Sequence, residues 1–308
     1  MSPALIRRAA RAAAALYHAG RFADALRIYQ KILKTVPDDA VFLHNLAVVE
    51  FRGGNPYQGV ETMKKALMAD AHTAVYFATM ADMISDEAYQ TYLKAPFYGP
   101  FNAQQMRQAI FTQMVDLMAP ATIFETGTFR GTSTEFMART APNAHLYSCE
   151  LMVNFYRFSS ERLRDVPNVT LVNLDSRSFL KRYVPLFSRP DVPSLFYLDA
   201  HWDEEDLPLL QELQIVFAAA PRAVVMIDDF QVWDDNGYAF DDYGPTRTIS
   251  LRYLAPLAPL GPHYFFPITA AQETGVRRGS VVVTLDPELA QRLARIPQLR
   301  PAPPQPDA

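Results

Sequence analysis

Acidic residues follow five short apolar runs in the middle of the chain, at the point where each run ends. They are Glu125 after ATIF, Glu150 after HLYSC, Asp175 after VTLVNL, Asp199 after SLFYL, and the pair Asp228–Asp229 after AVVMI. Aspartate is common in turns, but acids after all five runs are not explained by turn chemistry alone. This pattern predicts that the carboxylates converge on one crevice. A ligand rich in hydroxyls, amines or positive charge, or a metal ion, would fill it.

The five runs are rich in β-branched and aromatic residues, lack polar alternation and are separated by segments with helical patterns. This order predicts a parallel sheet with helices on both faces. The runs HYFFPITA and GSVVVTL near the end of the chain predict an antiparallel hairpin. The predicted fold is therefore α/β, with a Rossmann-like, doubly wound, mostly parallel seven-stranded sheet. Ligands bind such sheets outside the carboxyl ends of the strands, which is where the acids lie.

The stretch FETGTFRGTST (124–134) would form the turn after the first strand. It lacks the G-x-G-x-x-G pattern of a dinucleotide-binding turn, and Glu125 would repel a pyrophosphate. A zwitterionic cofactor with a sulfonium centre fits better. Its ammonium group can face acids, and its carboxylate can meet the amides that open a helix over 132–139. S-adenosylmethionine is such a cofactor.

FETGTFRGTST, Glu150, NLDSRSF and FYLDAHW together resemble the class I S-adenosylmethionine-dependent methyltransferases over about residues 119–285. The most similar members are small-molecule O-methyltransferases of the catechol and macrolide-sugar (macrocin) types. The resemblance implies that Glu125, Gly127 and Gly131 line the methionine end of the cofactor, with Thr132 or Ser133 near its carboxylate. It also implies that Glu150 binds the two ribose hydroxyls, and that Asp175 and Ser176 lie beside the adenine amine.

The same resemblance implies a magnesium site formed by Asp199, Asp228 and Asp229. Such an ion would lower the pKa of an acceptor hydroxyl and orient it. Neighbouring residues on a strand point to opposite faces, so Asp228 and Asp229 can share an ion only where the strand has ended. Otherwise one of them caps the next element and the other is solvated.

His201 stands where these methyltransferases usually carry a second acid. We expect Asp199 and His201 to be the catalytic residues, with the histidine taking the acceptor's proton. The imidazole would equally suit a nitrogen ligand to a transition metal, or a structural hydrogen bond. Trp202 is expected to form a wall of the pocket. The loop after the fifth strand offers weaker candidates for acceptor contacts: Tyr238, Asp241, Asp242, Tyr243 and Arg247.

The front of the chain contains a repeat. Residues 20–40 align with residues 54–74 at an offset of 34 without gaps, with small residues at Ala25 and Gly59. Apolar spacing of three and four within the repeat predicts helices. The pattern resembles the tetratricopeptide repeat (TPR), and a helix of a third unit would cover 75–84. Its role is either a groove for a protein partner or a packing appendage.

We therefore expect TPR-like helices over 1–84, a connecting helical segment over 85–118, a methyltransferase domain over 119–295 and a disordered proline-rich tail over 296–308. The net charge of −4 argues against a nucleic-acid partner. The one cysteine excludes an internal disulfide, and no apolar stretch approaches the length of a membrane span. These features predict a cytoplasmic protein.

Two functions remain. The favoured one is metal-assisted O-methylation of a small hydroxylated acceptor, such as a sugar or secondary metabolite. The alternative is a TPR interaction protein whose methyltransferase-like domain is a non-catalytic scaffold or ligand sensor. Glu125, Gly127, Glu150 and Asp175 are all present, which favours cofactor binding. The sequence does not identify the acceptor.

Overall fold

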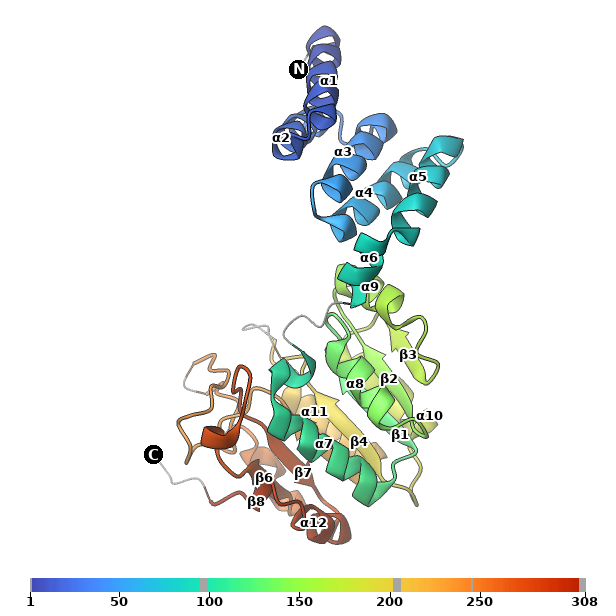
Figure 1. The fold of residues 1–308 in the computed structure, drawn as a ribbon. Coiled ribbons are helices and arrows are strands. Elements are labelled where there is room, and N and C mark those ends of the chain that lie inside the picture. The colour runs from blue at the N-terminus through green and yellow to red at the C-terminus, as the bar shows by residue number, and fades with distance from the viewer. Residues whose placement is uncertain (1, 95–98, 202–205, 245, 305–308) are drawn as a thin grey trace. The chain divides into compact units, whose positions relative to one another are not determined.

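A computed structural model describes residues 2–94, 99–201, 206–244 and 246–304 (Figure 1). The chain divides into two compact units, Met1–Ala95 and Pro96–Ala308. In the described part of the chain, no helix combines the length and the apolar character needed to cross a membrane.

The first unit is all-helical. Its helices are α1 (Pro3–His18), α2 (Phe22–Leu33), α3 (Ala40–Arg52), α4 (Pro56–Ala69), α5 (Ala74–Ser85) and α6 (Glu87–Lys94). Successive helices pack on one another. Ala25 is fully buried, and a Cβ on Gly59 would lie 2.8 Å from the carbonyl oxygen of Ala47. The small residues at the repeat positions therefore allow the close helix approach that the sequence predicts.

The second unit is built on one eight-stranded sheet. Its strands are β1 (Thr122–Thr126), β2 (His145–Cys149), β3 (Val169–Val172), β4 (Ser194–Leu198), β5 (Ala223–Ile227), β6 (His263–Pro267), β7 (Val281–Thr284) and β8 (Leu299–Pro301). The strand order is β3-β2-β1-β4-β5-β7-β6-β8. Strands β1 to β5 are parallel, and β7 runs antiparallel to both β5 and β6. The predicted doubly wound sheet and its hairpin are confirmed.

The eighth strand lies in the segment that we expected to be a disordered tail. Leu299–Pro301 pairs antiparallel with β6, and Leu299 is buried. The expectation of disorder from residue 296 is therefore wrong for this stretch. Proline is tolerated here because β8 is an edge strand, where one side of the backbone needs no partner.

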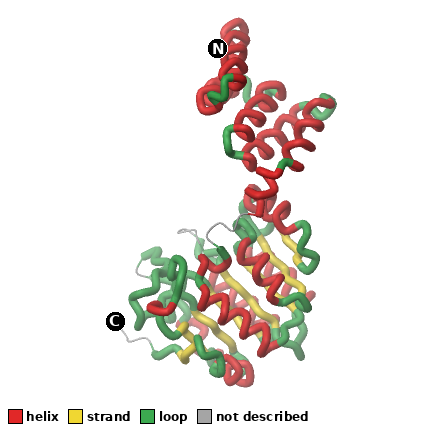
Figure 2. Tube along the Cα trace, viewed as in Figure 1, coloured by secondary structure: helices red, strands yellow, loops and turns green. Residues whose placement is uncertain are grey.

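Helices cover both faces of the sheet (Figure 2). They are α7 (Gln105–Met118), α8 (Thr132–Thr140), α9 (Val153–Leu163), α10 (Ser176–Phe187), α11 (Leu209–Ala219) and α12 (Pro287–Leu293). Alternate residues of one strand enter different cores, since Ile123 packs with α7, α8 and α12 while Phe124 packs with α10 and α11. Burial on both faces explains why these strands have no polar alternation.

The stretch 85–118, expected as a connecting segment, is divided between the two units. Helix α6 contacts α4 and α5 in the first unit. Helix α7 instead contributes Met106, Ile110 and Met114 to the core of the second unit.

Candidate functional site

The middle of the sheet contains a topological switch point. From β1, the chain proceeds outward through β2 and β3, whereas β4 and β5 lie on the other side of β1. Strands β1 and β4 are paired side by side to their carboxyl ends, and the helices that follow them, α8 and α11, lie on opposite faces of the sheet. The crevice between these two connections is where ligands bind in such folds. A cavity of about 500 Å³ lies at this edge.

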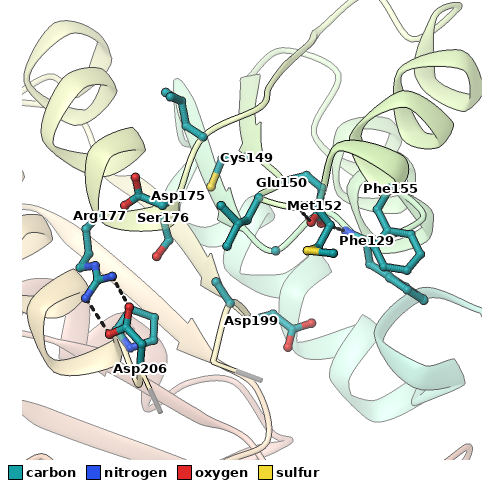
Figure 3. A pocket seen from close by; sticks show the side chains of 15 residues that line it. Phe129, Cys149, Glu150, Met152, Phe155, Asp175, Ser176, Arg177, Asp199 and Asp206 are labelled. Carbon is teal, nitrogen blue, oxygen red and sulfur yellow. Dashed lines mark hydrogen bonds and ion pairs between the residues drawn. The ribbon is translucent and has the colours of Figure 1, made fainter. Parts of the chain in front are cut away.

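The cavity is lined by residues from four of the five acidic strand ends or the turns that follow them. Gly127, Glu150, Asp175 and Asp199 all contribute, together with Ser176. Figure 3 shows Phe129, Met152 and Phe155 along one side of the cavity, with Arg177 and Asp206 opposite them. The guanidinium group of Arg177 pairs with the carboxylate of Asp206. Trp202, the expected pocket wall, lies outside the described residues.

Gly127 shapes the floor between β1 and β4. Its φ of +84° lies in the left-handed region, and a Cβ there would be 2.3 Å from the carbonyl oxygen of Asp199. Only glycine fits this approach without strain. Gly131 also has a positive φ, +73°, and is the N-cap residue of α8. It does not line the cavity, and its nearest neighbour is the flexible side chain of Leu163.

Glu125 lies beneath the turn and lines neither hollow at this edge of the sheet. It is fully buried, and its Oε2 accepts hydrogen bonds of 2.5 Å from the hydroxyls of Thr134 and Ser148. Burial raises the pKa of Glu125 to about 7. Within the part of the chain that the structure describes, its Oε1 has no hydrogen-bond partner. The placement of Glu125 against the methionine end thus differs from the expectation, because its carboxylate instead joins Thr134 of α8 to Ser148 of β2.

A smaller hollow of about 90 Å³ adjoins Gly127 and Asp199 at the N-terminus of α8. Thr132 and Ser133 line it, as does Tyr197. The hydroxyl of Ser133 accepts a 3.0 Å hydrogen bond from the amide of Phe101. The Thr132 hydroxyl is buried, and no described residue hydrogen-bonds to it. The first turn of a helix carries free amides and a partial positive charge, so this hollow suits a carboxylate.

Glu150 and Asp175 are held in place by backbone amides. Glu150 accepts hydrogen bonds of 2.8 Å from Phe129 and Met152, one on each oxygen. Burial raises its pKa above the usual value. Asp175 is the N-cap residue of α10 and accepts from the amide of Ser178. Although burial acts to raise the pKa of Asp175, its hydrogen bonds with Ser178 bring it below the usual value.

Three potential ligands for a cation meet at the ends of β4 and β5. One ligand atom each from Asp199, His201 and Asp229 lies within 4.8 Å of the others. This set differs from the one expected, because His201 takes the place of Asp228. Strand β5 ends at Ile227, and Asp229 has a φ of +53°. The two neighbouring aspartates therefore direct their carboxylates to different surroundings.

Asp228 belongs to a buried ion pair. Its carboxylate accepts hydrogen bonds from the guanidinium group of Arg107 and, at 2.5 Å, from the hydroxyl of Tyr197. Arg107 and Asp228 are each only 1% exposed. Burial acts to raise the pKa of Asp228, but the charge of Arg107 holds it below the usual value. With these partners, Asp228 positions the end of β5 and is not a member of the cation set.

Asp229 has a cationic neighbour of its own. Arg278, just before β7, pairs with Asp229 and also with Asp241. The Tyr243 hydroxyl lies 2.7 Å from Asp241 and 2.6 Å from the carbonyl oxygen of His201.

Burial and the charge of Asp228 raise the pKa of Asp229 to about 6. Burial, followed by the charges of Asp228 and Asp229, raises the pKa of Asp199 well above its usual value.

Sequence reasoning missed Arg107, Tyr197 and Arg278. Two signals were present in the sequence. Arg107 is a charged residue between the apolar positions of α7, and Tyr197 is a tyrosine inside the apolar strand β4. Neither indicates its partner, because Arg107 and Asp228 are 121 positions apart. Among the acceptor candidates, Asp241 and Tyr243 join the network beside His201. Tyr238 is instead buried next to the Met106 sulfur.

Residues 7–49 match the family model of the tetratricopeptide repeat. This agrees with the helical repeat seen in α1 to α3. The comparison with curated proteins gave no match.

Solved structures similar to the chain include three O-methyltransferases. TomG from Streptomyces achromogenes, solved in complex with SAM, is 19% identical, with 58% of this chain and 78% of that chain covered and a TM-score of 0.42. A putative O-methyltransferase from Klebsiella pneumoniae is 16% identical, with coverage of 70% and 98% and a TM-score of 0.46. The O-methyltransferase from Bacillus cereus, in complex with SAH, is 14% identical, with coverage of 70% and 99% and a TM-score of 0.46.

Proposed function

We propose that the second unit is an S-adenosylmethionine-dependent methyltransferase. The observation that carries the proposal is the cavity of about 500 Å³ at the switch point, with Glu150, Asp175 and Gly127 in its lining. Its volume lies within the range of small-molecule sites. Two of its polar groups, Glu150 and Asp175, are fixed by hydrogen bonds from backbone amides, which suits a nucleoside.

We propose a part of the cofactor for several of the lining residues. Glu150, with one amide on each oxygen, keeps acceptor capacity for the two ribose hydroxyls. Asp175 and Ser176 would lie beside the adenine amine. The carboxylate of the methionine moiety would sit in the adjoining hollow, where the unpartnered Thr132 hydroxyl and the first amides of α8 are available.

The acceptor we propose is a small hydroxylated molecule, methylated on oxygen with the assistance of a divalent metal. S-adenosylmethionine supplies a methyl group bonded to a positively charged sulfur, which an oxygen nucleophile attacks in line. A metal ion supplies positive charge that lowers the pKa of the acceptor hydroxyl. Asp199, His201 and Asp229 would hold the ion, and the unpartnered Nδ1 of His201 fits that role. The chain itself contributes positioning, since Gly127 fixes the cofactor turn against Asp199.

Calorimetric titration with S-adenosylmethionine tests the proposal directly. We expect the full-length protein to bind it. We expect Glu150→Ala to weaken binding by about 1–3 kcal/mol, the loss of a charge-assisted hydrogen bond. Glu161→Ala, on the exposed side of α9, is the matched control and should bind as the wild type does. Absence of binding by the wild-type protein would favour the non-catalytic scaffold instead.

We also propose that the first unit binds a protein partner. The match of residues 7–49 to the tetratricopeptide repeat supports this role, as do the half-exposed Val75 and Phe77 on α5. Affinity purification from the source cells, comparing wild type with Phe77→Glu, would test it. Leu260→Glu, an exposed position in the second unit, is the control. The assignment would be contradicted if the same protein is lost from both variants, or if Phe77→Glu retains every partner that the wild type captures.

A further inference from the structure

The cation set described above contains a nitrogen ligand where an all-oxygen set was expected. We propose that Asp199, His201 and Asp229 bind a divalent transition metal, such as Mn²⁺, in preference to Mg²⁺. This inference rests on the metal-assisted part of the proposed function, and it specifies the ion that the site selects.

The hydrogen bonding of His201 determines which nitrogen is available. Its Nε2 lies 3.0 Å from the carbonyl oxygen of Asp228. Because a carbonyl oxygen only accepts, Nε2 must carry the hydrogen. The neutral ring then has its lone pair on Nδ1. This atom is buried and has no hydrogen-bond partner among the described residues, and the residue is 2% exposed. A backbone carbonyl that holds the second ring nitrogen is the usual support of a metal-ligating histidine.

The two carboxylates each keep an oxygen for the ion. Asp229 uses Oδ1 for Arg278. Among the described residues, the carboxylate of Asp199 accepts one side-chain hydrogen bond, a long one of 3.4 Å to its Oδ2 from the Tyr197 hydroxyl. Two ligands on opposite sides of a first-row metal are about 4.2 Å apart at bond lengths near 2.1 Å. The three ligand atoms all lie within 4.8 Å of one another, so an inward movement of the side chains would bring them onto one ion.

The charge of the surrounding network suits a divalent ion. Four carboxylates, on Asp199, Asp228, Asp229 and Asp241, face the guanidinium groups of Arg107 and Arg278. With all of these groups ionised, two negative charges remain unbalanced. A divalent cation would neutralise them.

The choice of metal follows from the ligand types. Mg²⁺ takes oxygen ligands and keeps several waters, whereas imidazole suits first-row transition metals such as Fe, Ni and Zn. Mn²⁺ accepts carboxylate oxygens as Mg²⁺ does and belongs to the first-row series, so it suits a set of two carboxylates and one imidazole. A neutral nitrogen in place of a third carboxylate also removes charge that would attract Mg²⁺. Asp228 cannot replace that charge, because its carboxylate is occupied by Arg107 and Tyr197.

Metal binding by the full-length protein, stripped with a chelator and studied without cofactor or acceptor, tests the inference. We expect Mn²⁺, followed by electron paramagnetic resonance, to bind at least tenfold more tightly than Mg²⁺ does in competition. The pulsed spectrum of bound Mn²⁺ should show coupling to an imidazole ¹⁴N. This signature requires no variant, so it does not depend on how substitutions fold.

Two variants complete the test. His201→Asp, which supplies a third carboxylate, should shift the Mn²⁺-to-Mg²⁺ preference at least tenfold toward Mg²⁺. The matched control His263→Asn removes an exposed histidine of β6 and should bind as the wild type does. Equal affinity of the wild type for the two ions, or bound Mn²⁺ without ¹⁴N coupling, would overturn the inference and leave the methyltransferase proposal intact. Binding of neither ion would also remove the metal-assisted step, while cofactor titration would still decide the methyltransferase.

Discussion

The contact between Gly127 and Asp199 makes a quantitative prediction for an alanine substitution. A Cβ at residue 127 would lie 2.3 Å from the carbonyl oxygen of Asp199 and 2.7 Å from its carbonyl carbon. Both atoms are backbone at the end of β4, so neither can rotate away. At Gly131 the nearest atom is Cδ1 of Leu163, at 3.1 Å, and that side chain can shift. Both glycines have a positive φ.

These contacts set the expected costs. Left-handed backbone strain costs an alanine about 1–2 kcal/mol at either position. Overpacking against backbone adds about 1–3 kcal/mol at residue 127. We therefore expect Gly131→Ala to lose about 1–2 kcal/mol of unfolding free energy, and Gly127→Ala to lose about 2–5 kcal/mol.

Urea unfolding followed by tryptophan fluorescence measures these losses, because Trp202 and Trp233, the only two tryptophans, both belong to the second unit. Gly127→Ala should also weaken S-adenosylmethionine binding more than Gly131→Ala does, since only Gly127 lines the cavity. Equal stability of the two variants would refute the argument from backbone contact.

Three further predictions concern buried groups. Burial raises the pKa of Glu125 from 4.5 to about 7, so the folded state binds the proton more tightly than the unfolded state does. As the pH rises from 4.5 to about 7, the contribution of this group to the free energy of unfolding therefore falls by about 3 kcal/mol. Urea unfolding at several pH values should show that Glu125→Gln removes this fall, and an unchanged pH profile would contradict the assignment. Arg107→Met and Asp228→Asn should each lower the free energy of unfolding, measured by denaturation, by about 3–5 kcal/mol, because each leaves a buried charged partner unpaired. The double variant should lose less than the sum of the two single losses, and strictly additive losses would argue against the ion pair. In the first unit, Ile32→Ala should cost about 2–5 kcal/mol in thermal unfolding followed by circular dichroism, whereas Met68→Ala, at a position 79% exposed, should be nearly neutral.

Local patterns in the sequence were sufficient for the architecture. Strands buried on both faces require continuous apolar runs, so β1, β4 and β5 were visible without any knowledge of their neighbours. The carboxyl ends of parallel strands share one edge, which is why Glu150, Asp175 and Asp199 could be expected to line one cavity. Strand β8 was missed because its three residues pair only with β6 and carry little local signal.

The chemistry at the end of β5 depended on contacts between distant parts of the chain. The sequence presents Asp228 and Asp229 as equivalent neighbours. The tertiary structure separates them, since α7 brings Arg107 to the first and the segment before β7 brings Arg278 to the second. The position of a residue in the chain determines which strand end it occupies, but its partners and its protonation depend on which distant charges the fold buries beside it.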